Sequence, residues 1–177
     1  MLLSLRRRSE RRETIERLYG AIVAQARLPV FYTPLGVPDT IESRFDLIVL
    51  HVYLLFRRLA PDGAGARAIG QGVFDTFVAD MDGSLREMGT GDLAVPRRMR
   101  AMGEAFYGRA EAYDAALAAD NDDVLAAALS RNVYGDAANA EAARKLARYV
   151  RGAARALASQ DSAAITRGEI HLPMPEE

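Results

Sequence analysis

Histidine is the residue type in this chain that is best suited to catalysis or metal binding. It occurs twice, as His51 and His171. Neither lies in a Glu-x-x-His or His-Glu-x-x-His frame, so the sequence does not support a di-iron or zinc-protease site. His51 lies in the middle of the most apolar stretch, where an imidazole could bind a haem iron. A core histidine with satisfied hydrogen bonds is far more common at such a position, and we favour that interpretation.

The other reactive residue types form no catalytic pattern. The chain has no cysteine, which excludes thiolate ligands and a cysteine nucleophile. The Gly-Gln-Gly stretch at 70–72 follows no predicted strand, so it is not a dinucleotide-binding loop. Asp75, Asp80 and Asp82 lie on a predicted helix, where successive acids point apart, and this favours solvated acids over a cation site. We therefore predict a protein that is not an enzyme and that uses no cofactor.

Charges are sorted along the chain, although the net charge is only −1. Residues 73–123 contain eleven acids against five arginines, whereas both ends of the folded region are basic. Such sorting suggests oriented contacts with a charged partner, although solvated helix faces are the more common explanation.

Two arginine-rich stretches are candidate surfaces for anionic lipid heads, the phosphates of RNA or an acidic protein. One is the basic N-terminal segment with the start of the first helix, and the other is a stripe on the last long helix at steps of four, three and four residues. Aromatic residues do not interleave with this stripe, so RNA or DNA recognition has little support. A soluble face, or contact with the acidic middle of the same chain, is an equally good explanation of the stripe. The residues are Arg6, Arg7, Arg8 and Arg11 in the first surface, and Arg144, Arg148, Arg151 and Arg155 in the second.

Two glycines and an arginine stand out inside the fourth predicted helix. Gly103 and Gly108 each cost about 1 kcal/mol relative to alanine there, and such glycines usually permit the close approach of another backbone. Arg109 follows them and is expected to form a structural ion pair across a helix interface, rather than a ligand contact. The expected partners are Asp80, Asp82 or Glu87.

Helical periodicity dominates the chain and predicts a single all-α domain, a bundle of about six helices. Three prolines predict an extended, Pro-rich connector over residues 28–38, between the first and second helices. We expect a basic N-terminal segment at 1–8, the helical domain at 9–159 and a loosely ordered C-terminal tail at 160–177. The expected helices cover residues 9–26, 40–58, 66–88, 96–119, 124–134 and 139–159.

Hydropathy predicts a cytoplasmic protein. The order of apolar and basic residues at the N-terminus is wrong for a secretory signal. No apolar run is long enough for a membrane-spanning helix.

The order of motifs between residues 26 and 117 resembles the ubiquinol–cytochrome c chaperone family, the bacterial relatives of mitochondrial cytochrome b assembly factors. The motifs are FDTFVADMD (74–82), LREMGTGD (85–92), VP (95–96) and AFYGR (105–109), preceded by GVPDT (36–40), RF (44–45) and LH (50–51). Thr90 departs from the apolar residue expected between its two glycines, and the Ala-rich region after residue 118 has no match.

The resemblance implies an assembly chaperone that binds newly made cytochrome b, or another nascent membrane protein, for the bc1 complex. It also implies a small partner subunit, a position peripheral to the inner membrane, and contact of the arginine-rich ends with the membrane surface or a ribosome. Such a chaperone needs an adaptable apolar surface, and methionines cluster around the connection between the third and fourth predicted helices. The residues expected to contact the client or partner are Met81, Leu85, Arg86, Glu87, Met88, Asp92, Met99, Tyr107 and Arg109. The alternatives are a peripheral membrane-surface or scaffold protein acting through its arginine-rich helices, and a small helical enzyme or haem carrier using His51.

Overall fold

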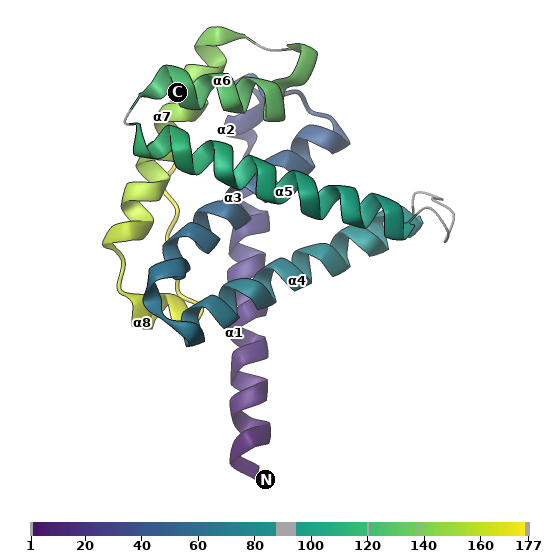
Figure 1. Ribbon diagram of the computed structural model, residues 1–177, viewed down its shortest axis with the longest axis vertical. Coiled ribbons are helices and arrows are strands. Elements are labelled where there is room, and N and C mark those ends of the chain that lie inside the picture. Colours follow the sequence, from purple (N-terminus) through teal and green to yellow (C-terminus); the bar gives the residue numbers. More distant parts are fainter. Residues whose placement is uncertain (1, 88–94, 120, 138, 176–177) are drawn as a thin grey trace.

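The computed structural model describes residues 2–87, 95–119, 121–137 and 139–175, and every regular element in these ranges is helical (Figure 1). The all-α prediction is therefore confirmed. Single turns of tighter or wider helix lie at Ala60–Asp62, Ser130–Tyr134 and Gly135–Ala137. The α-helices are α1 (Leu2–Ala26), α2 (Pro29–Tyr32), α3 (Ile41–Leu59), α4 (Ala64–Glu87), α5 (Val95–Ala118), α6 (Asp122–Leu129), α7 (Ala140–Ser159) and α8 (Ser162–Thr166).

Helix α3 forms the centre of the fold because it is apolar on almost every side. All residues from 47 to 55 are buried. The helix begins at the predicted place, where the Thr40 side chain accepts a hydrogen bond from the Ser43 backbone N–H at 3.2 Å. Helices α1, α4 and α7 pack around α3, α5 also contacts it, and α6 packs on α5 and α7 (Figure 1).

The end of α4 and the start of α5 converge on the right of Figure 1, opposite the side where α7 and α8 lie. We call these parts, residues 78–87 and 95–107, the α4–α5 arm. No helix among the described residues is long and apolar enough to cross a membrane.

The ends of the chain and the first connector differ from the expectations. Residues 2–8 continue α1 instead of forming a separate segment. The connector contains the short helix α2, because Pro29 occupies the first helical position, where its missing N–H is not needed. Residues 160–175 pack on the body instead of lying loose: Ile165 is fully buried, and Ile170 and Leu172 pack against the core.

Gly72 of α4 and two glycines of α5 have opposite surroundings. A Cβ atom built on Gly72 would lie 2.3 Å from Cδ1 of Ile15, so α1 crosses α4 closely at this point. At Gly103 and Gly108 such an atom would meet nothing within 4 Å among the described residues. The expectation of a close approach at these two glycines is wrong, because no helix of the described residues packs on that side of α5.

Alanine substitutions at these glycines are therefore expected to have opposite signs. Gly72→Ala should lower the free energy of unfolding by about 1–3 kcal/mol through overpacking. Gly108→Ala should raise it by up to about 1 kcal/mol through helix propensity. Urea denaturation of the full chain measures both effects. Adding Ile15→Val to Gly72→Ala removes the clashing Cδ1 and should recover part of the loss; a Gly72→Ala chain as stable as the wild type would show that the crossing is not tight.

Candidate functional site

The base of the α4–α5 arm is an aromatic cluster shared by α3, α4 and α5. The Phe74 and Phe106 rings are 4.7 Å apart at their centroids, and Tyr107 lies 6.2 Å from Phe74 and 5.6 Å from Phe106. The other rings of the cluster are buried or half-buried, whereas Tyr107 is 58% exposed. A large ring held rigidly at the surface is the kind of residue that contributes most to protein–protein binding. The cluster consists of Phe45, Phe56, Phe74, Phe77, Phe106 and Tyr107.

The structure describes only part of the predicted client surface on this arm. Met81 is half-buried against the core, while Arg86 and Glu87 are exposed. The Arg86 guanidinium donates to the Asp82 carboxylate at 2.8 Å, an ordinary pair within one helix. The predicted contacts Met88 and Asp92, and the side chains of Leu85 and Met99, lie outside the described residues.

The arginine of the arm's base has a partner that the sequence did not indicate. Arg109 pairs with Asp46 of α3 at 2.9 Å, and not with Asp80, Asp82 or Glu87. The two side chains are 22% and 14% exposed. Burial raises the pKa of Asp46 to about 6, although the charge of Arg109 opposes this rise. The ion pair is structural, as expected, and it joins α5 to the central helix.

The acids for which a cation site was considered and not favoured contact separate partners. Asp80 accepts a hydrogen bond from the Tyr19 hydroxyl of α1 at 2.7 Å, and Asp75 accepts one from Gln71 at 2.8 Å. Within the described ranges, no group of three or more histidines and acids is placed to hold a metal ion.

His51 is a fully engaged core residue. Its Nδ1 lies 2.6 Å from the Leu47 carbonyl oxygen, and its Nε2 lies 2.7 Å from the Tyr149 hydroxyl. Because a carbonyl oxygen only accepts, Nδ1 carries the proton and Nε2 accepts from Tyr149. Burial lowers the pKa of His51 to about 4, so the imidazole is neutral. This agrees with the core interpretation and leaves no ring nitrogen free for haem iron.

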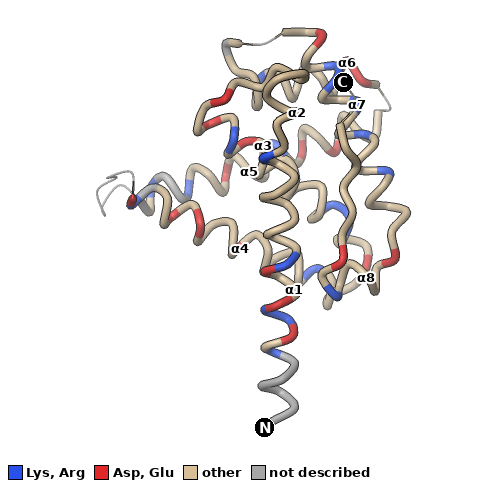
Figure 2. The backbone as a smooth tube through the Cα atoms, turned by 180° about the vertical axis from the view of Figure 1, so that it is seen from behind, with Lys and Arg blue, Asp and Glu red and all other residues tan. Residues whose placement is uncertain are grey.

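The arginine stripe on α7, whose basic positions are blue in Figure 2, is partly internal. Arg144 pairs with Asp123 of α6 at 2.8 Å, and Arg151 with Asp122 at 2.7 Å. Arg151 is buried, so its assignment to a binding surface is wrong: α6 covers this part of α7 and supplies the acid. Arg148 and Arg155 are exposed.

At the N-terminal surface, Arg8 is exposed, and Arg11 donates a hydrogen bond to the Ala68 carbonyl of α4 at 2.6 Å. The side chains of Arg6 and Arg7 lie outside the described residues. The contact of either arginine surface with lipid or a ribosome stays a prediction.

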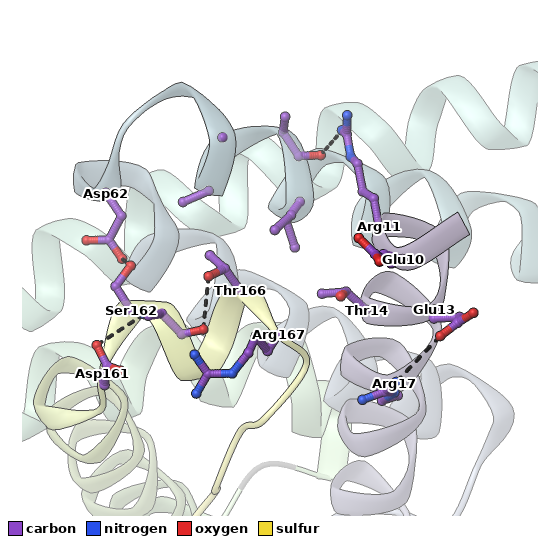
Figure 3. A pocket seen from close by; sticks show the side chains of 15 residues that line it. Glu10, Arg11, Glu13, Thr14, Arg17, Asp62, Asp161, Ser162, Thr166 and Arg167 are labelled. Atoms are coloured by element: carbon purple, nitrogen blue, oxygen red, sulfur yellow. Dashed lines mark hydrogen bonds and ion pairs between the residues drawn. The ribbon is translucent and has the colours of Figure 1, made fainter. Parts of the chain in front are cut away.

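An open groove of about 1070 Å³ lies between α1, the start of α4 and α8 (Figure 3). Its lining carries both signs of charge, and these charges interact within the chain: Arg17 pairs with Glu13 at 3.6 Å and Arg167 with Glu169 at 3.5 Å. Asp161 caps α8 through its hydrogen bond from the Ala163 N–H at 3.1 Å. We assign no ligand to this groove.

The fold and the exposed Tyr107 ring define an all-α protein with a surface suited to binding another protein. The chain belongs to the ubiquinol–cytochrome c chaperone family, whose model matches residues 33–172. The predicted family is thereby confirmed. The crystal structure of the Cbp3 homolog from Brucella abortus superposes with a TM-score of 0.89 at 39% identity, over 98% of this chain and 97% of that one.

Two vertebrate relatives are named ubiquinol–cytochrome c reductase complex assembly factor 1. The Xenopus laevis protein is 29% identical over 117 residues, which are 66% of this chain and 58% of that protein. The mouse protein is 27% identical over 118 residues, 67% of this chain and 40% of that protein. The chain thus spans about half the length of these relatives.

Proposed function

We propose that the chain is an assembly chaperone of the ubiquinol–cytochrome c reductase complex and that its client is newly made cytochrome b. The family match over residues 33–172 and the names of the relatives support the assembly role. The proposal includes a small partner subunit and a position at the inner membrane surface, where exposed arginines such as Arg148 would face anionic groups.

The client contact is assigned to the α4–α5 arm because of one observation, the exposed ring of Tyr107 on an otherwise covered aromatic cluster. The cluster holds the ring in place, so little conformational entropy is lost when a partner packs on it. An apolar helix of a membrane protein offers the surface that such a ring prefers.

Capture of the client from solubilised membranes tests this proposal. The full chain, tagged and expressed in its own cells, is expected to recover cytochrome b. Tyr107→Ala should reduce the recovery at least tenfold, the loss typical of a central aromatic contact. Deleting the gene for this chain should lower the amount of assembled ubiquinol–cytochrome c reductase complex.

Val124→Ala is the matched control, since Val124 is 47% exposed and lies on α6, which contributes no ring to the arm's aromatic cluster. Its recovery should equal that of the wild type. If cytochrome b is recovered equally with all three chains, the arm is not the contact surface; if it is recovered with none, and assembly is normal without the chain, the proposed function is wrong.

A further inference from the structure

The C-terminal residues 169–175, which we call the C-terminal strap, run in an extended conformation from α8 along α1 and α7 (Figure 1). The strap follows Gly168, whose positive φ of 91° ends α8. The Gly168 N–H donates to the Ile165 carbonyl at 2.9 Å, and the Glu169 N–H donates to the Ala164 carbonyl at 3.1 Å. A Cβ on Gly168 would lie 3.2 Å from Arg17 Cβ, so the strap starts in close contact with α1. Arg17 and Arg167 flank this starting point (Figure 3).

Side-chain amides hold the backbone of the strap. The Gln160 amide donates to the His171 carbonyl at 2.7 Å and accepts from the His171 N–H at 2.9 Å. The Gln25 amide donates to the Pro173 carbonyl at 2.8 Å. These contacts match the peptide's own chemistry: a donor and an acceptor face His171, and a donor faces the proline carbonyl, since proline has no N–H to satisfy.

Alternate side chains of the strap supply the apolar contacts. Ile170 and Leu172 pack against the core, whereas His171 between them is exposed. This is the alternation of an extended strand lying on an apolar surface. Met174 near the end of the strap is 66% exposed.

The Gln25 amide is set in place by the buried histidine. The Tyr149 hydroxyl donates to His51, so its oxygen is left to accept from Gln25 at 3.1 Å. This fixes which end of the Gln25 amide is nitrogen and directs its second N–H to the strap. The donor to the peptide is therefore pre-oriented by the core, and does not depend on the strap's side chains.

We infer that the surface of α1 and α7 under the strap is a peptide-binding site, occupied in this chain by its own C-terminus. Its occupant from another protein is an extended segment of the pattern apolar-x-apolar-Pro, recognised through its backbone and two alternate side chains. The chain's strap competes with such a segment because it is tethered beside the site. This inference does not depend on the proposed client or on the α4–α5 arm.

The test uses the full chain and a fluorescein-labelled peptide of residues 168–177, with binding measured by fluorescence anisotropy. The double variant Ile170→Asp/Leu172→Asp weakens the strap and leaves the site intact. It is expected to bind the peptide at least tenfold more tightly than the wild type. Adding Gln160→Ala removes two backbone contacts and should reverse most of this gain. Met174→Asp, in the exposed part of the strap, is the matched control and should behave as wild type.

Failure of the strap variant to bind the peptide, when its circular dichroism shows a folded chain, would overturn the inference. Hydrogen exchange on the wild-type chain gives a second measurement if that variant does not fold. The His171 amide is expected to exchange at least a hundredfold faster than the Val150 amide of α7, through opening of the strap alone. Equal rates would mean that the strap leaves only on global unfolding, and would also overturn the inference.

Discussion

Arg109→Ala is expected to lower the free energy of unfolding by about 3 kcal/mol, because it leaves the Asp46 carboxylate largely buried without its cation. The guanidinium is the charge that opposes the burial-driven rise in the pKa of Asp46. Without it that pKa should rise further, so the loss of stability should grow as the pH is raised. Urea unfolding of the full chain at several pH values measures both effects.

Two other variants separate the ion pair from ordinary loss of contacts. Arg144→Ala breaks a pair of similar length to Asp123, but both side chains are more than half exposed, so less than about 1 kcal/mol should be lost. The double variant Asp46→Leu/Arg109→Met replaces both charges and should be within about 1 kcal/mol of the wild type. If Arg109→Ala costs no more than Arg144→Ala, the pair does not hold α5 to α3.

Local signals were enough to predict most of the helices. Proline, glycine and capping residues interrupt the helical periodicity clearly, and Asn121 and Asn139 accept backbone hydrogen bonds at the starts of α6 and α7. The run of apolar residues around His51 identified the buried central helix. These features depend on residues a few positions apart, which the sequence shows directly.

Contacts between helices distant in sequence could not be predicted in the same way. Asp46 lies near the start of α3, far in sequence from Arg109, and periodicity does not say which helices cross. For the same reason Gly72, at a tight crossing, looked no different from Gly103, which faces open space. The spacing of Arg151 fits an exposed stripe in the sequence, and only the structure shows that α6 covers it.

The candidate site was predicted in part. Tyr107 was selected from the family motif, and its exposure on an aromatic base came only from the structure. The strap was missed because its signal is one alternation of Ile170 and Leu172 beside Pro173, too short to distinguish from a loose tail. Gln25 and Gln160 carried no signal at all, since an exposed and a structural glutamine look alike in sequence.

Two buried groups, His51 and Asp46, are expected to keep the free energy of unfolding nearly constant between about pH 4 and 6.5, because their contributions change in opposite directions. The pKa of His51 is 6.5 when unfolded and about 4 when folded, so the unfolded chain binds more protons in this window. Its contribution, about 3 kcal/mol, is present above pH 6.5 and is lost as the pH falls toward 4. Asp46 acts in the opposite direction: its pKa rises from 3.8 to about 6, so the folded chain binds more protons. Its contribution is present below pH 3.8 and about 3 kcal/mol is lost as the pH rises through 6.

Substitution of either group should leave the pH dependence of stability that the other group causes. His51→Gln keeps a donor for the Leu47 carbonyl and an acceptor for the Tyr149 hydroxyl but does not titrate. This variant should gain stability as the pH is lowered from 6.5 to 4, because Asp46 then acts alone. Asp46→Asn should lose stability over the same range, because only His51 remains. Urea unfolding at pH 4.5, 5.5 and 6.5 measures the three slopes. Equal slopes in all three chains would show that neither group titrates differently in the folded state. Slopes of the reverse sign would show that folding raises the pKa of His51 and lowers that of Asp46.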